Sequence, residues 1–276
     1  MTAPWLELAR HDMPLLVSMP HTGTEIPPAL EAHFVSGFGA RKDADYWVHQ
    51  LYDFAHELGA TTLRTRICRS VIDVNRDPSG ASLYAGQATT DLCPVTTFDG
   101  EPLYERGFAP DAAQITARRS EFFDPYHAQL TSELARLRAR HPCVVLYDAH
   151  AIRSRIPRLF TGMLPELNLG TFDGKSCDLT LARELARVCE HSGRSWVRDG
   201  RFKGGWTTRH YGRPAAGVHA VQMELACRSY LLEPDSPDAA NWPAPYEADR
   251  AAALRSTLRA LLQQCLDFAL SRTEPA

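Results

Sequence analysis

Short hydrophobic runs alternate along the chain with longer segments in which hydrophobic residues recur every three or four positions. Five runs have the length and composition of buried β-strands: 14–19, 61–67, 71–74, 143–147 and 218–225. Four segments have the periodicity of amphipathic helices: 46–58, 111–140, 178–192 and 247–271. This alternation of strands and helices predicts a layered α/β fold.

Two long stretches, 77–110 and 152–177, lack any such periodicity and are rich in glycine, proline, threonine and aspartate. Irregular segments of this length inside a folded chain are often functional loops. In contrast, the leucine stripe in 247–271 predicts a closing helix that packs against the core.

Composition narrows the class of protein. With 276 residues, the chain can form one large α/β domain or two small ones. A net charge of -3 argues against a nucleic-acid partner. No hydrophobic run approaches the roughly 20 residues that span a bilayer, and the N-terminus lacks a secretory signal. The seven cysteines are scattered, without a C-x-x-C pair, so we expect neither a disulfide framework nor a zinc finger, and a cytoplasmic location.

Two of the predicted strands lead directly into a histidine. The run at 15–19 is followed by Pro20 and His21, and the run at 144–147 leads to His150. Ligands of open α/β sheets bind at the carboxyl ends of strands. Zinc is bound by imidazole nitrogens and carboxylate oxygens, so two such histidines with carboxylates nearby suggest a catalytic metal site. A single strand-end histidine is more often a hydrogen-bonded structural residue.

The third ligand is open on the residues alone. Glu25 lies four positions after His21, but in a loop this spacing does not fix geometry. Asp43 and Asp45 stand immediately before the helical segment 46–58 and are the rival carboxylates. Either aspartate could instead cap that helix.

Two further carboxylates lie within hydrophobic strands. Asp148 faces the same side of its strand as His150 and either orients that histidine or caps the following loop. Glu224 closes the run at 218–225, where an unpaired carboxylate is costly to bury. Near a metal-bound water Glu224 would be a general base. The alternative is a buried ion pair, for instance with Arg228.

A third cluster is cationic. Arg69 and Arg76 flank the run at 71–74, and the planar fork of arginine binds carboxylates in bidentate fashion. Two such arginines suit a small dicarboxylate. The alternative is that they form ion pairs with Asp73 or Asp77.

The segment 201–212 combines cations, hydroxyls and glycines, with Lys203 and Arg209 offering positive charge. It is a ligand-binding loop or a basic surface loop, but it lacks the spacing of a phosphate loop. No Gly-x-Ser-x-Gly elbow occurs, and we do not expect Cys68 or Cys227 to act as nucleophile.

Taken together, these motifs resemble the N-formylglutamate amidohydrolase (N-formylglutamate deformylase) family of histidine breakdown. The matching stretches are 18–23, 51–60, 71–76, 147–154, 167–171 and 200–212. Each is weak alone, but the ordered set, within a region from near residue 14 to about 230, is specific.

The resemblance implies a fold and a metal. This family is similar to zinc carboxypeptidases and aspartoacylases, which implies a single domain over residues 1–276 with a mixed β-sheet flanked by helices, zinc-carboxypeptidase-like (phosphorylase/hydrolase-like). It also implies one Zn²⁺ held by His21, His150 and a carboxylate, for which it favours Asp45 over Glu25.

The resemblance further implies the remaining roles. Glu224 resembles the general base, and Asn75 with Arg76 resembles the pair that binds the substrate carboxylate in aspartoacylases. Arg69 and Arg209 complete the expected substrate-binding set. The implied reaction is metal-dependent hydrolysis of N-formyl-L-glutamate to formate and L-glutamate, the last step of a histidine degradation route.

Two alternatives accompany this expectation. One is a zinc hydrolase of another N-acyl amino acid or small amide, and the other is a non-catalytic small-molecule binding protein on the same fold. Three departures from the family pattern bear on the acyl group: Tyr46-Trp47 in place of Trp-His, Ala151 in place of serine, and Trp206 in place of histidine.

Overall fold

A mixed β-sheet runs through the computed structural model, which describes residues 3–82, 86 and 88–272. In these residues the sheet has seven strands in the order β1-β3-β2-β4-β7-β5-β6. Its strands are β1 (Leu6–Ala9), β2 (Leu15–Met19), β3 (Thr61–Thr65), β4 (Val144–Ile152), β5 (Leu167–Gly170), β6 (Trp196–Arg198) and β7 (Val218–Ala226). The central strands β3, β2, β4 and β7 are parallel, while β1 and β5 pair antiparallel with β3 and β7. This confirms the predicted mixed α/β fold.

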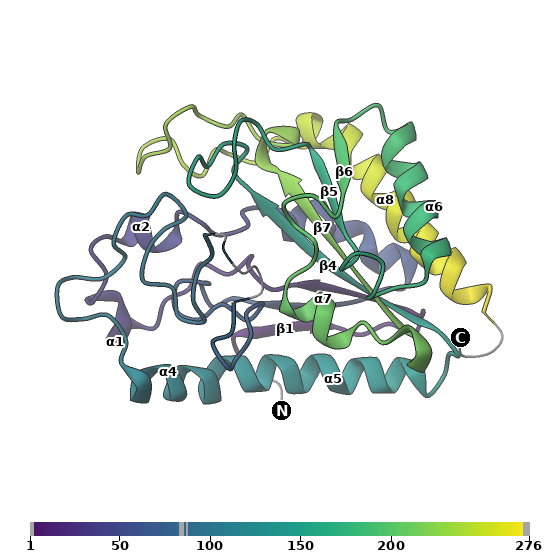
Figure 1. Ribbon diagram of the computed structural model, residues 1–276, viewed down its shortest axis with the longest axis horizontal. Coiled ribbons are helices and arrows are strands. Elements are labelled where there is room, and N and C mark those ends of the chain that lie inside the picture. The colour runs from purple at the N-terminus through teal and green to yellow at the C-terminus, as the bar shows by residue number, and fades with distance from the viewer. Residues whose placement is uncertain (1–2, 83–85, 87, 273–276) are drawn as a thin grey trace.

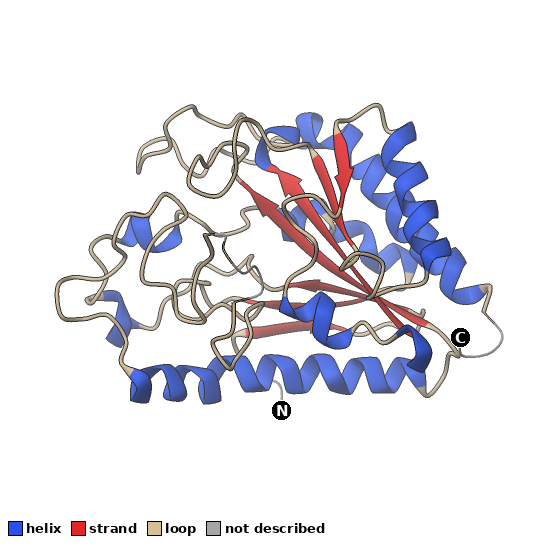
Figure 2. Ribbon diagram, in the orientation of Figure 1, coloured by secondary structure: helices blue, strands red, loops and turns tan. Residues whose placement is uncertain are grey.

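Helices cover both faces of the sheet (Figure 1, Figure 2). The helices of the described residues are α1 (Pro28–Glu31), α2 (Gly37–Arg41), α3 (Val48–Leu51), η1 (Asp53–Leu58), α4 (Ala112–Arg118), η2 (Arg119–Phe123), α5 (Asp124–Arg138), α6 (Leu179–His191), α7 (Trp206–Tyr211), η3 (Pro214–Ala216), η4 (Cys227–Ser229) and α8 (Ala248–Leu270), and some of them, such as α1 and α2, lie beside the sheet (Figure 1). One face packs against α3, η1, α6 and α8, and the other against α5 and α7. No helix in the described part of the chain is long and apolar enough to cross a membrane.

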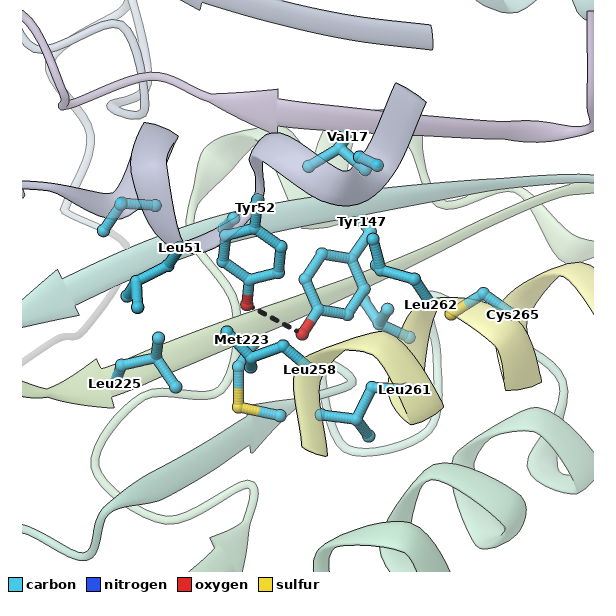
Figure 3. Packing of buried hydrophobic residues seen from close by; sticks show 14 of the residues in the cluster. Val17, Leu51, Tyr52, Tyr147, Met223, Leu225, Leu258, Leu261, Leu262 and Cys265 are labelled. Atoms are coloured by element: carbon cyan, nitrogen blue, oxygen red, sulfur yellow. Dashed lines mark hydrogen bonds between the residues drawn. The ribbon is translucent and has the colours of Figure 1, made fainter. Parts of the chain in front are cut away.

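Strand β4 is buried on both faces, which explains why its sequence is a continuous hydrophobic run. Successive residues point to opposite faces. Val145 and Tyr147 therefore enter the core beneath α8, while Leu146 packs toward α5. The Tyr147 hydroxyl lies 3.1 Å from that of Tyr52, which follows α3 (Figure 3).

The run at 71–74 was predicted to be a strand, and this prediction is wrong. Its side chains are buried, but its backbone forms hydrogen bonds with groups outside the sheet. Arg118 donates to the Val71 carbonyl oxygen, and His127 donates to the Val74 carbonyl oxygen. The Asp73 amide donates to the Leu92 carbonyl oxygen. The segment is therefore a buried turn.

The short elements β1, β5, β6 and α7 were not predicted, and β5 lies within the stretch 152–177 that was expected to be irregular. Two predicted helices are interrupted. The segment 46–58 divides into α3 and η1, and 111–140 contains the π-helical turn η2. Pro125 follows that turn and has no amide hydrogen to continue the regular pattern.

Candidate metal centre and substrate pocket

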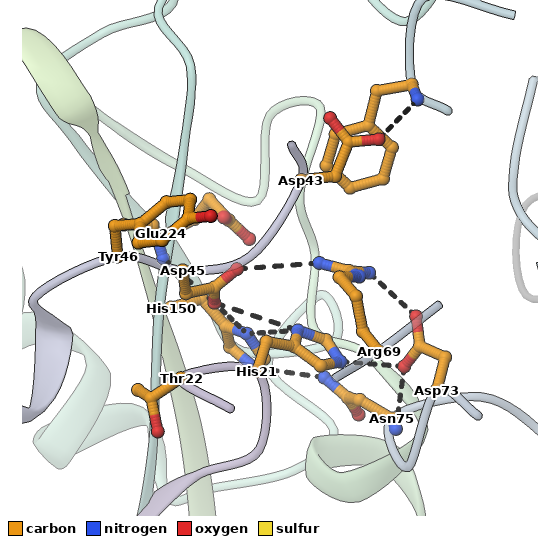
Figure 4. A network of polar contacts seen from close by, with 12 residues as sticks. His21, Thr22, Asp43, Asp45, Tyr46, Arg69, Asp73, Asn75, His150 and Glu224 are labelled. Atoms are coloured by element: carbon orange, nitrogen blue, oxygen red, sulfur yellow. Dashed lines mark hydrogen bonds and ion pairs between the residues drawn. The ribbon is translucent and has the colours of Figure 1, made fainter. Parts of the chain in front are cut away.

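Three candidate ligands from distant parts of the chain meet at the carboxyl ends of the parallel strands. His21 follows β2, His150 lies near the end of β4, and Asp45 lies between α2 and α3. The Nδ1 atoms of the histidines are 3.1 Å apart. Asp45 Oδ2 lies 3.1 Å from His150 Nδ1 and 3.7 Å from His21 Nδ1 (Figure 4). All three residues are at most 2% exposed.

This group fits a zinc ion. Ligand atoms about 2.1 Å from a tetrahedral zinc lie about 3.4 Å from one another, within the range of the three separations. The two Nδ1 lone pairs also face each other, an arrangement that requires a cation or a proton between them. Two imidazoles and one carboxylate form the donor set of many catalytic zinc sites, with one position open.

Local contacts explain why Asp45, and not Glu25, lies at this group. The Asp45 amide donates to the His21 carbonyl oxygen over 2.9 Å, and the Ala151 amide donates to Asp45 Oδ2 over 3.1 Å. Glu25 instead pairs with Arg66, with about half of each side chain exposed.

The rival carboxylate Asp43 also lies outside the group of ligands. It accepts hydrogen bonds from the Phe98 amide and from Arg153. Burial raises the pKa of Asp43, against the lowering effect of Arg153.

A carboxylate also holds the outer nitrogen of each histidine. Asp73 Oδ1 lies 2.7 Å from His21 Nε2, and Asp148 Oδ2 lies 2.9 Å from His150 Nε2. A proton on each Nε2 leaves Nδ1 free to bind a metal, a common arrangement around zinc. Burial acts to raise the pKa of Asp73, but Arg76, His21 and Arg69 together hold it well below its usual range.

Glu224 lies at the end of β7, in register with His150 on the neighbouring strand. Gln222 Nε2 donates to Glu224 Oε2 over 3.2 Å. Burial raises the pKa of Glu224 to about 7, which suits a group that must both accept and release a proton near neutral pH. Among the described residues, no ion pair joins Glu224 to Arg228, the alternative partner.

His21, His150 and Glu224 line a pocket whose empty space is about 570 Å³, open solvent included. The polar lining comprises His21, Arg69, Asn75, Arg76, Thr89, Thr90, His150, Arg201, Gln222 and Glu224. The remaining lining residues are Ala88, Phe98, Ile152, Leu159, Phe202 and Gly205. The pocket therefore combines cations, an apolar surface and the candidate metal centre.

A sequence model of the N-formylglutamate amidohydrolase family matches residues 13–231. The chain belongs to this family. It is 47% identical over 268 residues to the N-formylglutamate deformylase of Pseudomonas aeruginosa, covering 97% of this chain and 98% of that protein. It is 45% identical over 261 residues to the N-formylglutamate deformylase of Pseudomonas putida, covering 94% of this chain and 95% of that protein. Membership confirms the predicted enzyme class, an amidohydrolase.

The fold of this amidohydrolase agrees with solved structures. The crystal structure of N-formylglutamate amidohydrolase from Ralstonia eutropha superposes with a TM-score of 0.73 at 24% identity, covering 96% of this chain and 97% of that one. A gene product of Agrobacterium tumefaciens superposes with a TM-score of 0.70 at 19% identity, covering 95% and 94%.

Of the three arginines predicted to bind substrate, Arg69 and Arg76 line the pocket and Arg209 does not. Arg69 and Arg76 also lie 2.7 Å and 3.6 Å from Asp73 Oδ2. The ion pairs with Asp73, the alternative interpretation, are therefore present, and the role of both arginines in substrate binding stays a prediction. Arg209 is not among the residues that line the pocket. It lies over the Phe172 ring and donates to the Gly204 carbonyl oxygen.

Arg201 lines the pocket but was not predicted to bind substrate, although it lies in the motif at 200–212. The sequence offered several cations in that motif and no signal that separates them. Arg201 and Arg209 differ in their neighbours in space, and the neighbours that separate them, Leu159 and Ala88 for Arg201 and Phe172 for Arg209, come from other segments of the chain.

The side chain of Asn75 is held between two elements. Its Nδ2 donates to Asp148 Oδ2 over 3.1 Å, and its Oδ1 accepts from the Thr207 amide over 2.8 Å. A Cβ at Gly205 would come within 2.6 Å of the Asn75 amide, so only glycine allows this close approach. Asn75 thus ties the start of α7 to β4 beside the metal centre.

Cys68 and Cys227 lie near the site, and both are buried. Burial raises the pKa of both thiols, so neither is disposed to form the thiolate that acts as a nucleophile.

Proposed function

We propose that this amidohydrolase hydrolyses N-formyl-L-glutamate to formate and L-glutamate at a single zinc ion held by His21, Asp45 and His150. One observation carries the proposal: ligand-type atoms of His21, Asp45 and His150 lie within 4.8 Å of one another, and the two histidines line a pocket that Glu224 and several arginines also line. The names of the relatives, N-formylglutamate deformylase, support the choice of substrate.

Zinc at this site would supply Lewis acidity, which activates water and polarises the formyl oxygen. Glu224 takes the proton from the attacking water as its oxygen bonds to the formyl carbon. Glu224 then delivers that proton to the amine nitrogen as the carbon–nitrogen bond breaks, releasing formate and glutamate. A pKa of about 7 allows Glu224 to perform both transfers.

The cations of the pocket orient the substrate. Arg69 and Arg76 lie beside the metal centre through their shared contact with Asp73, and charge-assisted hydrogen bonds from them hold a substrate carboxylate. Holding the substrate in a fixed orientation places the formyl carbon against the water and Glu224.

The decisive experiment combines metal analysis with formate release. The purified protein should contain about one zinc per chain, and should release formate from N-formylglutamate faster than it hydrolyses N-acetyl- or N-carbamoylglutamate. A chelator should abolish turnover and added zinc should restore it. A chain with no stoichiometric metal and no chelator-sensitive activity would contradict the proposal and favour a binding protein. Faster hydrolysis of the N-acetyl or N-carbamoyl compound would contradict the proposed substrate and assign that compound instead.

Replacing Glu224 with glutamine should lower kcat by orders of magnitude, because the amide cannot accept the proton. Zinc content should stay near that of the wild type, since Glu224 is not one of the proposed ligands. Zinc analysis and formate release on the same preparation separate the two effects. Near-normal turnover in E224Q would remove Glu224 from the mechanism.

A further inference from the structure

Arg201 is fixed in the pocket wall by two loops that are far apart in sequence. Its Nε donates to the Leu159 carbonyl oxygen over 2.8 Å, and its Nη2 donates to the Ala88 carbonyl oxygen over 2.9 Å. Both acceptors are neutral, so these bonds set the plane of the guanidinium without cancelling its charge. Arg201 therefore brings a positioned positive charge to the same pocket as the metal centre.

Arg201 is anchored differently from the other two pocket arginines. Arg69 and Arg76 both contact Asp73, which in turn contacts His21, so they belong to the network around the metal centre. The bonds of Arg201 go to the backbone carbonyl oxygens of Leu159 and Ala88, and the loop that carries Ala88 also carries Thr90, which accepts from Arg76. The pocket thus offers two arginines that contact Asp73 and a third, Arg201, that the backbone of two loops holds in place.

The proposed substrate carries two carboxylates at different distances from the reacting nitrogen. In N-formylglutamate the α-carboxylate is attached to the carbon that carries the reacting nitrogen. The second carboxylate is separated from that carbon by the methylene groups of the side chain. Hydrophobic residues also line the pocket, namely Phe98, Ile152, Leu159 and Phe202, and can contact those methylene groups.

We propose that Arg201 is a specificity-determining residue that binds the side-chain carboxylate, while Arg69 and Arg76 bind the α-carboxylate. This inference rests on the proposed function and names a residue of the same site. Because Leu159 and Ala88 fix the position of Arg201, the pocket selects substrates by the length of the side chain. N-formylglutamate is accepted in preference to N-formylaspartate.

The test measures kcat and KM for Arg201→Met with N-formylglutamate and with N-formylglutamine, which replaces the side-chain carboxylate with a neutral amide. Loss of a charge-assisted hydrogen bond should lower kcat/KM for N-formylglutamate by roughly 100-fold, mainly through KM. The value for N-formylglutamine should change little. The value of kcat/KM for 4-formamidobutyrate, which lacks only the α-carboxylate, should fall by as much as that for N-formylglutamate.

Two variants serve as controls. Arg198→Met removes an arginine at the end of β6 whose side chain is 43% exposed, and should leave the preference for N-formylglutamate unchanged. Arg201→Lys keeps the positive charge without the fork that joins both carbonyl oxygens, and should retain part of the preference.

Equal losses for all three substrates in Arg201→Met would overturn the inference and leave Arg201 a structural link between loops. Equal losses for N-formylglutamate and N-formylglutamine, with little change for the analogue that lacks the α-carboxylate, would also overturn it and assign Arg201 to the α-carboxylate instead. Failure of the proposed function would appear separately, as absence of formate release by the wild type. In that case calorimetry can still measure the affinities of the wild type and of Arg201→Met for L-glutamate and L-glutamine. If the wild type binds L-glutamate more tightly than L-glutamine and Arg201→Met does so to the same extent, the inference is overturned.

Discussion

Asp148 fixes the geometry of the metal centre without being a candidate ligand. One of its oxygens accepts from Ser18 Oγ over 2.9 Å, and the other accepts from His150 and Asn75. Ser18 lies in turn 2.9 Å from the hydroxyl of Tyr126. Since all these groups are buried, the carboxylate has fixed partners on both oxygens, and the ring of His150 takes its orientation from them.

Replacing Asp148 with asparagine should weaken zinc binding by about 10- to 100-fold, because an amide has no negative charge and can accept at only one of the two oxygen positions that Asp148 uses. Competition with a chelator at fixed pH measures the dissociation constant. Ser18→Ala, which removes a donor to the other oxygen, should have a smaller effect. If D148N bound zinc as tightly as the wild type, the orientation of His150 would not depend on this carboxylate.

The choice between Asp45 and Glu25 can also be tested at single residues. Asp45→Asn should raise the zinc dissociation constant by about 100-fold or more, above the loss expected for an outer partner. Glu25→Gln should leave zinc binding unchanged, because Glu25 pairs with Arg66 at the surface. Metal analysis after dialysis against a weak chelator compares the two. The reverse result would make Glu25 the ligand and require this loop to rearrange.

At the scale of elements, the sequence predicted those strands whose hydrophobic pattern matches their burial in the fold. The strands β2, β4 and β7 carry long hydrophobic runs because the sheet is covered on both faces. β5 and β6 have four and three residues, too few to show a period. The run at 71–74 is as hydrophobic as a strand, but it is buried by its surroundings and not by pairing.

The contact between Tyr52 and Tyr147 joins the helical segment after α3 to β4, and it is suited to a double-mutant cycle. Tyr147→Phe should destabilise the protein by about 1 kcal/mol, because the buried Tyr52 hydroxyl loses its partner. Tyr52→Phe should cost a similar amount. The double variant should cost about as much as one single variant, and not their sum.

Urea unfolding measures the cycle, with an unchanged m-value as the sign that the same structure unfolds. Additive losses in the double variant would mean that the two hydroxyls do not interact.

At the scale of the whole molecule, the candidate site depends on contacts between distant segments. The hydrophobic patterns place His21, His150 and Glu224 at the carboxyl ends of strands, so these residues could be nominated from the sequence. Asp45 lies in a turn, and its approach depends on backbone contacts with His21 and Ala151. Such contacts have no local pattern, so the choice of Asp45 depended on a family resemblance.

A buried histidine outside the metal centre gives the folded molecule a testable pH dependence. His127 on α5 donates through Nε2 to the Val74 carbonyl oxygen over 2.7 Å, and its Nδ1 lies 3.0 Å from the Tyr211 hydroxyl on α7. It thus joins α5, the turn at 71–74 and α7. Burial lowers the pKa of His127 from 6.5 to about 4, so the folded protein keeps this side chain neutral.

Between pH 6.5 and about 4 the unfolded chain protonates this histidine while the folded protein does not. The stability contributed by neutral His127 is therefore complete above pH 6.5 and is lost as the pH falls toward 4, a change of about 3 kcal/mol. His127→Gln should be less stable than the wild type at neutral pH, yet lose less stability on acidification. Urea unfolding of both proteins across this pH range gives the difference, in which contributions from other groups such as His219 cancel. Parallel stability curves for the two proteins would show that His127 is protonated as readily in the folded state as in the unfolded chain.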